Sequence, residues 1–203
     1  MPGQACETIP RAGTCQRFRC GAVERHGGYL PGALAARPHE TAERATQPMP
    51  TVFLDCDGVL ADFEGGASRV LGMPPEVFRS RFGQKRFWNR LAAEADFFAR
   101  LDVLPDAQEL YAALEARQPV ILTGLPRGTW AEPQKRRWAE RHFPGVPMIA
   151  TTAALKREHC KPGDALVDDR DTHRHLWEQA GGLFVHHRDA ASSLRALRTH
   201  GFI

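Results

Sequence analysis

The sequence predicts an α/β fold built on a parallel, doubly wound sheet. Short apolar runs recur along the chain, and segments in which apolar residues have helical spacing separate them. This alternation is typical of a three-layer, Rossmann-like domain with helices on both faces of the sheet. Residues 62–104 have helical texture and no strand pattern, so we expect a helical insertion after the first strand. The expected strands lie at 51–55, 119–124, 147–150, 164–167 and 183–185.

Length and composition indicate an ordinary globular protein. The chain has 203 residues, of which 42% are hydrophobic and 25% charged, enough for one α/β domain with an insertion. No run approaches the roughly 20 apolar residues of a membrane span. A formal charge of +3 does not indicate nucleic-acid binding, and it is compatible with small anionic partners.

Residues 1–48 are rich in proline, glycine and arginine and show no apolar periodicity. We expect this extension to be disordered, because it has too little apolar surface to bury. It lacks the apolar core of a signal peptide, and its glutamates disfavour a transit peptide. Met49 directly precedes the first strand, so we expect the native chain to start there.

The five cysteines predict neither a disulfide framework nor a zinc site, because their number is odd and none forms a Cys-x-x-Cys pair. The cytoplasm is therefore the expected compartment. A metal site made by the three cysteines of the extension is an alternative. These are Cys6, Cys15 and Cys20.

The first strand ends in two carboxylates, Asp55 and Asp57, followed by a break at Gly58. An Asx turn with a helix cap would explain one aspartate. Two buried carboxylates at a strand end instead suggest phosphoryl transfer, because burying charge is costly without a function. Asp55 would attack phosphorus, and Asp57 would protonate the leaving oxygen and later activate water. A hard cation such as Mg²⁺ would offset the repulsion between carboxylate and phosphate.

The stretch from Asp55 to Phe63, Asp-Cys-Asp-Gly-Val-Leu-Ala-Asp-Phe, resembles the first motif of the haloacid dehalogenase (HAD) superfamily of phosphatases. It is most similar to the motif of the 5'(3')-deoxyribonucleotidase branch. The resemblance covers residues 51–185 and implies a magnesium-dependent phosphomonoesterase. It also implies a HAD-like core, formed by 49–61 and 105–203, under a small helical cap at 62–104.

The expected cap has helices beginning near Phe63 and at Pro74-Pro75, and a third around Trp88. In the resembled branch a cap shapes the substrate pocket, so its aromatic side chains are candidates for a wall that stacks on a base. The alternative is that they form the core of the cap itself. These side chains are Phe87, Trp88, Phe97 and Phe98.

The second strand ends in Thr123-Gly124. In the family a hydroxyl at this position binds the transferring phosphate, and the amides of a glycine turn can cradle its oxygens. The sequence continues Leu125-Pro126, whereas the resembled branch more often has proline directly after the hydroxyl residue. This departure weakens the narrow substrate assignment and leaves the phosphate role of Thr123 and Gly124 intact.

Two lysines, Lys156 and Lys161, are candidates for the ammonium group that offsets the charge of the phosphate. Lys156 follows the third strand and so lies at the carboxyl end of the sheet, where such sites form. Lys161 precedes the fourth strand and falls at the opposite end. We therefore favour Lys156.

The fourth strand ends in Asp168-Asp169, a second pair of carboxylates. In the family such a pair completes the Mg²⁺ shell together with Asp55 and the Asp57 carbonyl. The resemblance favours Asp169 as the direct ligand and Asp168 as its support, and the sequence leaves the choice open. His186 and His187 follow the fifth strand, and we expect a solvated pair there rather than a pocket wall.

These features together predict a phosphomonoesterase for nucleoside or deoxynucleoside 5'-monophosphates. A phosphatase for another small phosphomonoester, such as a sugar phosphate, is the alternative within enzymes. A catalytically silent binding module is the alternative outside them, and the presence of Asp57 argues against it, because binding alone does not need that group. The oligomeric state is not predicted.

Overall fold

The computed structural model of the protein describes residues 49–203. The predictions made above for residues 1–48, including those for its three cysteines, lie outside the described residues. Cys56 and Cys160 are both free thiols.

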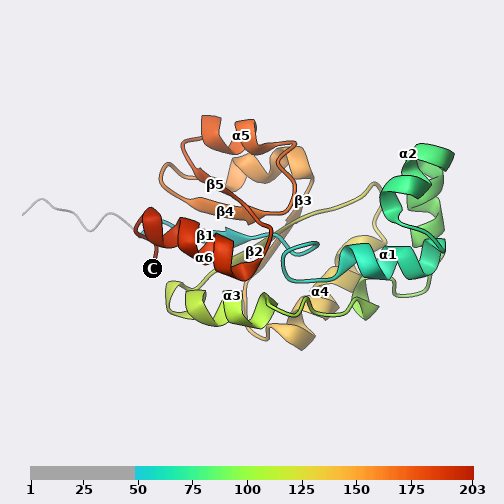
Figure 1. Ribbon diagram of the computed structural model, residues 1–203, viewed down its shortest axis with the longest axis horizontal. Coiled ribbons are helices and arrows are strands. Elements are labelled where there is room, and N and C mark those ends of the chain that lie inside the picture. The colour runs from blue at the N-terminus through green and yellow to red at the C-terminus, as the bar shows by residue number, and fades with distance from the viewer. Residues whose placement is uncertain (1–48) are drawn as a thin grey trace, which may run out of the picture. The chain divides into compact units, whose positions relative to one another are not determined.

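Five parallel strands form one sheet in the order β3-β2-β1-β4-β5 (Figure 1). All five predicted strands are present and the α/β fold class is confirmed. Leu54, in the central strand, pairs with Ile121 on one side and Val167 on the other, so the carboxyl ends of β1, β2 and β4 meet at one edge. The strands are β1 Val52–Leu54, β2 Val120–Gly124, β3 Met148–Thr151, β4 Ala165–Asp168 and β5 Leu183–His186.

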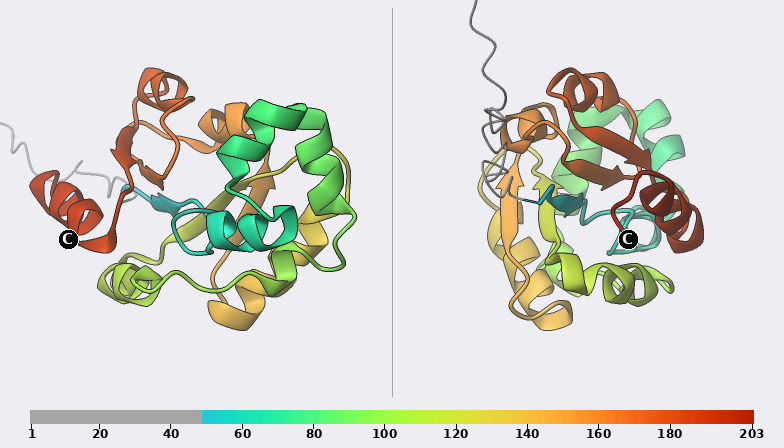
Figure 2. Two further views of the ribbon diagram at one scale, coloured as in Figure 1. Left: turned by 45° about the vertical axis from the view of Figure 1, so that its right-hand side comes forward. Right: turned by 90° about the vertical axis from the view of Figure 1, so that its left-hand side faces the viewer.

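Alternate residues of each strand point to opposite faces of the sheet and enter two separate cores. Leu54 and Val167 pack in the larger core, whereas their neighbours Phe53 and Leu166 pack in the smaller one. Helices α3, α4 and α6 cover the first face, and α5 covers the second (Figures 1 and 2). Their bounds are α3 Ala107–Leu114, α4 Ala131–His142, α5 Arg174–Gln179 and α6 Ala190–Thr199.

Short 3-10 helices complete the chain. They are η1 Phe98–Arg100, η2 Glu115–Arg117 and η3 Ala153–His159.

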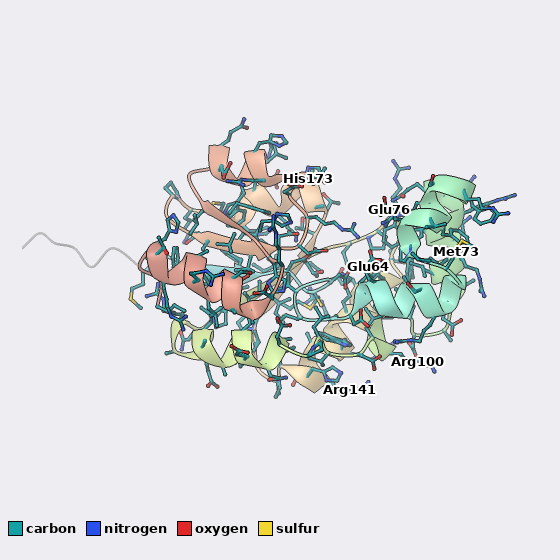
Figure 3. All side chains as sticks on the ribbon, viewed as in Figure 1. Glu64, Met73, Glu76, Arg100, Arg141 and His173 are labelled. Carbon is teal, nitrogen blue, oxygen red and sulfur yellow. The ribbon has the colours of Figure 1, made fainter. Side chains whose placement is uncertain are left out.

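The helical segment between β1 and β2 begins with α1 Phe63–Leu71 and α2 Pro75–Ala92, marked in Figure 3 by Glu64 on α1 and Glu76 on α2. Gly72 ends α1 in the left-handed conformation, and Pro75 opens α2 at its first turn, as predicted. The two further helices expected here run directly into one another within α2. Gly83, with φ 80° and ψ 161°, interrupts the helical backbone at their junction.

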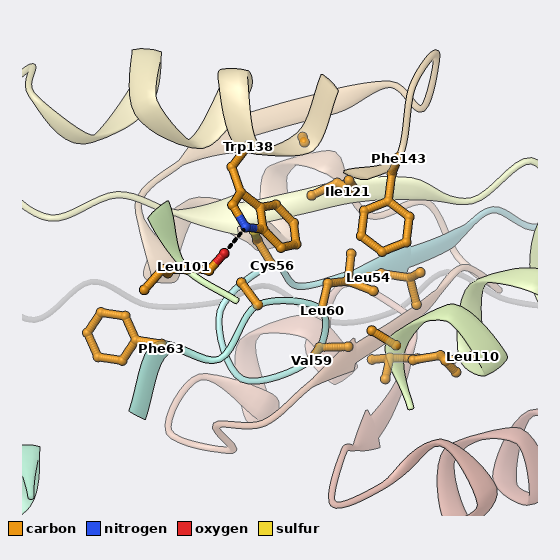
Figure 4. Packing of buried hydrophobic residues seen from close by; sticks show 14 of the residues in the cluster. Leu54, Cys56, Val59, Leu60, Phe63, Leu101, Leu110, Ile121, Trp138 and Phe143 are labelled. Carbon is orange, nitrogen blue, oxygen red and sulfur yellow. Dashed lines mark hydrogen bonds between the residues drawn. The ribbon is translucent and has the colours of Figure 1, made fainter. Parts of the chain in front are cut away.

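Trp138 on α4 joins this segment to the larger core (Figure 4). Its ring is buried, and its Nε1–H donates to the backbone carbonyl of Leu101 at 2.8 Å. Helix α4 begins at Ala131, and Pro133 lies in its first turn, where a proline removes no helical hydrogen bond. No helix of residues 49–203 is long and apolar enough to cross a membrane.

We predict that Gly83→Ala destabilises the protein by about 1 to 3 kcal/mol, because φ 80° with ψ 161° is a backbone region that only glycine adopts readily. A Cβ there would meet no atom within 4 Å, so the cost comes from the backbone alone. The free energy of unfolding from urea denaturation tests this. Ser80→Ala, exposed on the same helix, is the control and should change stability by no more than about 0.5 kcal/mol. Equal stability of the two variants would contradict the prediction.

Candidate active site

Three carboxylates converge where the two central strands end. Asp55 directly follows β1, Asp168 is the last residue of β4, and Asp169 comes next. The Asp55 amide donates to the carbonyl of Val167 at 2.9 Å, which holds the two strand ends together. One oxygen from each of the three carboxylates lies within 4.8 Å of the others. The sheet therefore brings together the two acidic pairs that the sequence singled out.

Asp57 lies in the tight turn that follows. The amide of Ala61 donates to the Cys56 carbonyl at 2.8 Å, and the Gly58 amide donates to the Ala61 carbonyl at 2.9 Å. Gly58 has φ 79°, and a Cβ there would lie 2.4 Å from an Asp169 carboxylate oxygen. Glycine is thus required both for the backbone conformation and for the close approach of the turn to Asp169.

Lys156 reaches the same cluster from η3, after β3. Its Nζ lies 2.9 Å from Asp55 Oδ1 and donates a hydrogen bond to Asp168 Oδ2 at 2.7 Å. Burial alone would lower the pKa of Lys156, but these carboxylates outweigh it and the pKa is raised, so the ammonium stays charged. Lys161 lies in the turn before β4, where its backbone amide donates to Asp164. It is at the far end of the sheet, as the sequence argument expects.

A second buried lysine, Lys135, was not anticipated. From α4 its Nζ donates to Asp57 Oδ2 at 2.6 Å, to Thr123 Oγ1 at 2.7 Å and to the Gly124 carbonyl at 3.1 Å. Lys135 is 1% exposed and Thr123 is fully buried. One ammonium group therefore links the two predicted phosphate-binding residues to Asp57.

The sequence did hold a signal for Lys135. Ala131, Lys135, Trp138 and Ala139 are the buried residues of α4, and their spacing is that of one helical face. A lysine on the apolar face of a helix must find a buried anionic partner, since an isolated buried ammonium is very costly. The predictions made above did not use this signal.

Burial, together with the charges of neighbouring carboxylates, raises the pKa of Asp57, Asp168 and Asp169. Burial raises the pKa of Asp57, and the Asp55 carboxylate adds to the effect, although Lys135 opposes it. Burial, followed by the charges of Asp55 and Asp168, raises the pKa of Asp169 to about 7. Burial and the charge of Asp55 also raise the pKa of Asp168, although its partner Lys156 opposes this shift. Such a cluster is stable in ionised form only with added positive charge.

The donor set fits a hard divalent cation. All the acidic donors are carboxylate oxygens, which Mg²⁺ prefers, and an octahedral shell at about 2.1 Å separates its oxygens by distances that this cluster can meet. Asp55 Oδ1 and Asp57 Oδ1 are buried and accept no hydrogen bond, although Lys156 Nζ makes a charge contact with the former. These oxygens are available to a ligand.

A cavity of about 1010 Å³ opens above the cluster. Asp55, Asp57, Lys156, Asp168 and Asp169 form its floor. Its far side is supplied by α2, which begins near Glu76 in Figure 3, and another side by the start of α5 at His173. Five phenylalanine and tryptophan side chains line it, namely Phe63, Trp88, Trp130, Trp177 and Phe184.

Of the four aromatic residues predicted as a base-stacking wall, only Trp88 lines this cavity. Phe87, Phe97 and Phe98 are buried in the larger core, where all three rings pack against Phe63. For these three the alternative interpretation, that they form the core of the helical segment, is the correct one. Trp88 follows Phe87 on the helix and is only half-buried, so its ring packs on the edge of that core, 4.9 Å from the Phe87 ring, and also lines the cavity.

The two histidines after β5 differ from the expectation of a solvated pair. His186 is exposed, with its Nε2 3.0 Å from the Asp169 carbonyl oxygen. His187 is buried, and its Nδ1 lies 2.9 Å from Ser193 Oγ. The prediction was therefore wrong for His187. Neither residue lines the cavity.

Comparison with known proteins agrees with this geometry. The model of the family described as "5' nucleotidase, deoxy (Pyrimidine), cytosolic type C protein" matches residues 49–185, well over half of the chain. The chain belongs to this family. Membership confirms the predicted resemblance to HAD-superfamily phosphatases of the deoxyribonucleotidase branch, and with it an enzyme of the phosphatase and nucleotidase class.

Two mitochondrial 5'(3')-deoxyribonucleotidases are among the relatives of this family member. The Mus musculus protein is 30% identical over 149 residues, and the Homo sapiens protein is 28% identical over 141. The matches cover 63% and 59% of this chain, and 67% and 61% of those proteins. The names of both relatives specify mitochondria, and the cytoplasmic location inferred from the cysteines stays a prediction.

Solved structures of low identity are also similar. A HAD-superfamily hydrolase of subfamily IA from Geobacter sulfurreducens has 18% identity and a TM-score of 0.41, covering 67% of this chain and 85% of that one. A hydrolase from Pseudomonas syringae has 14% identity and a TM-score of 0.42, covering 74% and 99%.

We predict that Asp169→Asn stabilises the metal-free protein at pH 8 by roughly 2 to 4 kcal/mol. The folded-state pKa of Asp169 is raised to about 7 from a usual 3.8, so the folded state loses stability as pH rises through this window. The difference between variant and native protein should vanish near pH 4, where Asp169 is protonated in the native fold. Urea denaturation in the presence of a chelator, at both pH values, tests it. Asp171→Asn, an exposed neighbour, is the control, and an equal effect of both variants would refute the assignment.

Proposed function

We propose that this family member is a Mg²⁺-dependent phosphomonoesterase that forms an aspartyl-phosphate and acts on nucleoside or deoxynucleoside 5'-monophosphates. The observation that supports it most is the convergence of Asp55, Asp168 and Asp169, with Lys156 beside them, on the floor of one cavity. We also propose that residues 62–104 act as a cap over a catalytic core formed by 49–61 and 105–203.

In the first half of the cycle, an oxygen of Asp55 forms a bond to phosphorus as the ester oxygen leaves. Asp57 donates its proton to that leaving oxygen, so the product is an uncharged alcohol. The raised pKa of Asp57 supports this role, since a general acid must hold its proton near neutral pH.

In the second half, Asp57 takes a proton from water, the water oxygen bonds to phosphorus and the Asp55–phosphorus bond breaks. Inorganic phosphate leaves and Asp57 is protonated again for the next cycle. The bond from Lys135 holds the Asp57 carboxylate in place through both halves. Lys135 is thus a positioning residue for proton transfer.

The same ammonium orients Thr123, whose hydroxyl accepts from Lys135 and so has its own proton free to donate to a phosphate oxygen. Gly124 is the last residue of β2, and backbone amides where the strand ends can receive a second oxygen. Lys156 offsets phosphate charge beside the nucleophile. Asp55, Asp168, Asp169 and the Asp57 carbonyl would hold Mg²⁺, which supplies Lewis-acid stabilisation of the phosphoryl charge.

The walls favour a planar ring over a sugar phosphate alone. Phe63, Trp88 and Trp130 offer aromatic faces, and stacking on such faces tolerates any base. Gln84 and Asn89 of α2 also line the cavity and provide amide groups for the edge of a base. A phosphatase for sugar phosphates would gain little from these side chains.

Replacing the nucleophile gives the most direct test. Asp55→Asn should lower phosphate release by at least about 10³-fold on every compound of a nucleotide and sugar-phosphate panel, because the amide cannot form the phospho-intermediate. Native activity should require Mg²⁺. The measurement is phosphate release with and without the metal, and Asp171→Asn, exposed beyond the cluster, is the matched control. An active Asp55→Asn protein would exclude the proposed mechanism.

Selectivity is tested at the wall. Trp88→Ala should raise KM for 5'-nucleotides about tenfold or more, because loss of one base stack costs about 1 to 3 kcal/mol, while ribose 5-phosphate should be affected less than about twofold. Steady-state kinetics on both substrates measure the split. Val77→Ala, an exposed position of α2 outside the cavity, is the control. A parallel loss on both substrates would favour the alternative of a general small-molecule phosphatase.

A further inference from the structure

Three cations around the mouth of the cavity have no role in the cycle above. Lys85 on α2, Arg127 in the loop after β2 and Arg157 on η3 all line the cavity, and all three are exposed. Among the described residues, none of them forms an ion pair or a side-chain hydrogen bond with another group. We call these three residues the cationic rim.

The floor does not need the rim for charge balance. Its four carboxyl groups, Asp55, Asp57, Asp168 and Asp169, carry at most four negative charges, which two buried ammonium groups and a divalent cation would balance. The other guanidinium in the cavity wall, Arg170, is already engaged. Its Nε lies 3.9 Å from Asp169 Oδ2 and its Cζ lies 5.9 Å from the centre of the Phe63 ring.

The position of the rim separates it from the phosphate site. Arg157 directly follows Lys156 but is exposed, whereas Lys156 is buried against Asp55. Arg127 lies in the loop after Thr123 and Gly124, the last two residues of β2, and Lys85 lines the same cavity from α2. A phosphate on the floor would therefore occupy Lys156 and leave the rim cations free for another group of the same ligand.

We propose that the cationic rim binds a second anionic group of the substrate, so that the preferred substrate is a nucleoside bisphosphate, with one phosphate on the floor and the other at the rim. This inference rests on the proposed function. Guanidinium groups bind phosphate oxygens in a bidentate fashion, and two of the three rim residues are arginines. The volume of about 1010 Å³ lies at the upper end of small-ligand pockets and accommodates the additional phosphate.

A competing explanation is electrostatic steering, in which exposed cations only speed the approach of any anion. Steering speeds association, increases with the charge of the ligand and weakens with salt, because exposed charges are screened over about 8 Å at physiological ionic strength. A binding site for a second phosphate acts only on ligands that carry one. The two explanations therefore differ at high ionic strength, where steering is screened and a site in direct contact with the second phosphate still favours the bisphosphate.

The test compares deoxythymidine 3',5'-bisphosphate with deoxythymidine 5'-monophosphate by phosphate release with Mg²⁺. One variant removes the rim charges through Lys85→Gln, Arg127→Gln and Arg157→Gln. A control removes three exposed charges that do not line the cavity, through Arg86→Gln, Arg188→Gln and Arg198→Gln. Native protein should show kcat/KM about tenfold higher for the bisphosphate. The rim variant should lose this advantage and change less than about threefold on the monophosphate, and the control should retain it.

Two outcomes would overturn the inference while leaving the proposed function intact. One is hydrolysis of the monophosphate with no advantage for the bisphosphate. The other is an advantage for the bisphosphate that disappears at high salt in the native protein, as steering requires. If neither compound is hydrolysed, the proposed function fails instead. Calorimetric titration of native protein with both compounds then decides the inference, which needs tighter binding of the bisphosphate that the rim variant lacks.

Discussion

Mutual repulsion among carboxylates at the ends of two neighbouring strands is the constraint on which this site depends. The sheet order places β1 beside β4, and parallel pairing in register brings Asp55, Asp168 and Asp169 together. Water cannot screen these charges well, because the cluster is largely buried. The fold must therefore supply compensating charge at atomic distances.

Two lysines provide that charge from opposite faces of the sheet. Lys135 comes from α4, which packs in the larger core, and holds Asp57. Lys156 comes from η3, whose end packs in the smaller core, and contacts Asp55 and Asp168. Neither lysine takes the place of the other, since each reaches different carboxylates. A doubly wound fold suits this arrangement because both layers of helices end near the same edge of the sheet.

The sequence predicted the strands and their acidic ends well, because both signals are local. Apolar runs identify buried strands, and the carboxyl ends of parallel strands share one edge, so Asp55, Asp168 and Lys156 follow from position alone. Lys135 did not follow, since its contact with Asp57 depends on where α4 packs. The cavity wall was harder still to predict from the sequence. Phe63 and Trp130 lie far apart in sequence and meet only in the folded chain.

Phe87 and Trp88 differ in position, since only Trp88 lines the cavity, and this difference shows that the residues for substrate selectivity are distinct from those for the phosphoryl chemistry. Successive helical residues point about 100° apart, so one ring anchors the segment in the core while the next faces the cavity. The Trp88 ring also contacts the Phe87 ring, at 4.9 Å between centroids, so a change at Trp88 alters the wall and the edge of this core and leaves the charge balance of the floor untouched. Substitutions in the helical segment can therefore change which ester is accepted, while the strand-end carboxylates and their two lysines retain the phosphoryl chemistry.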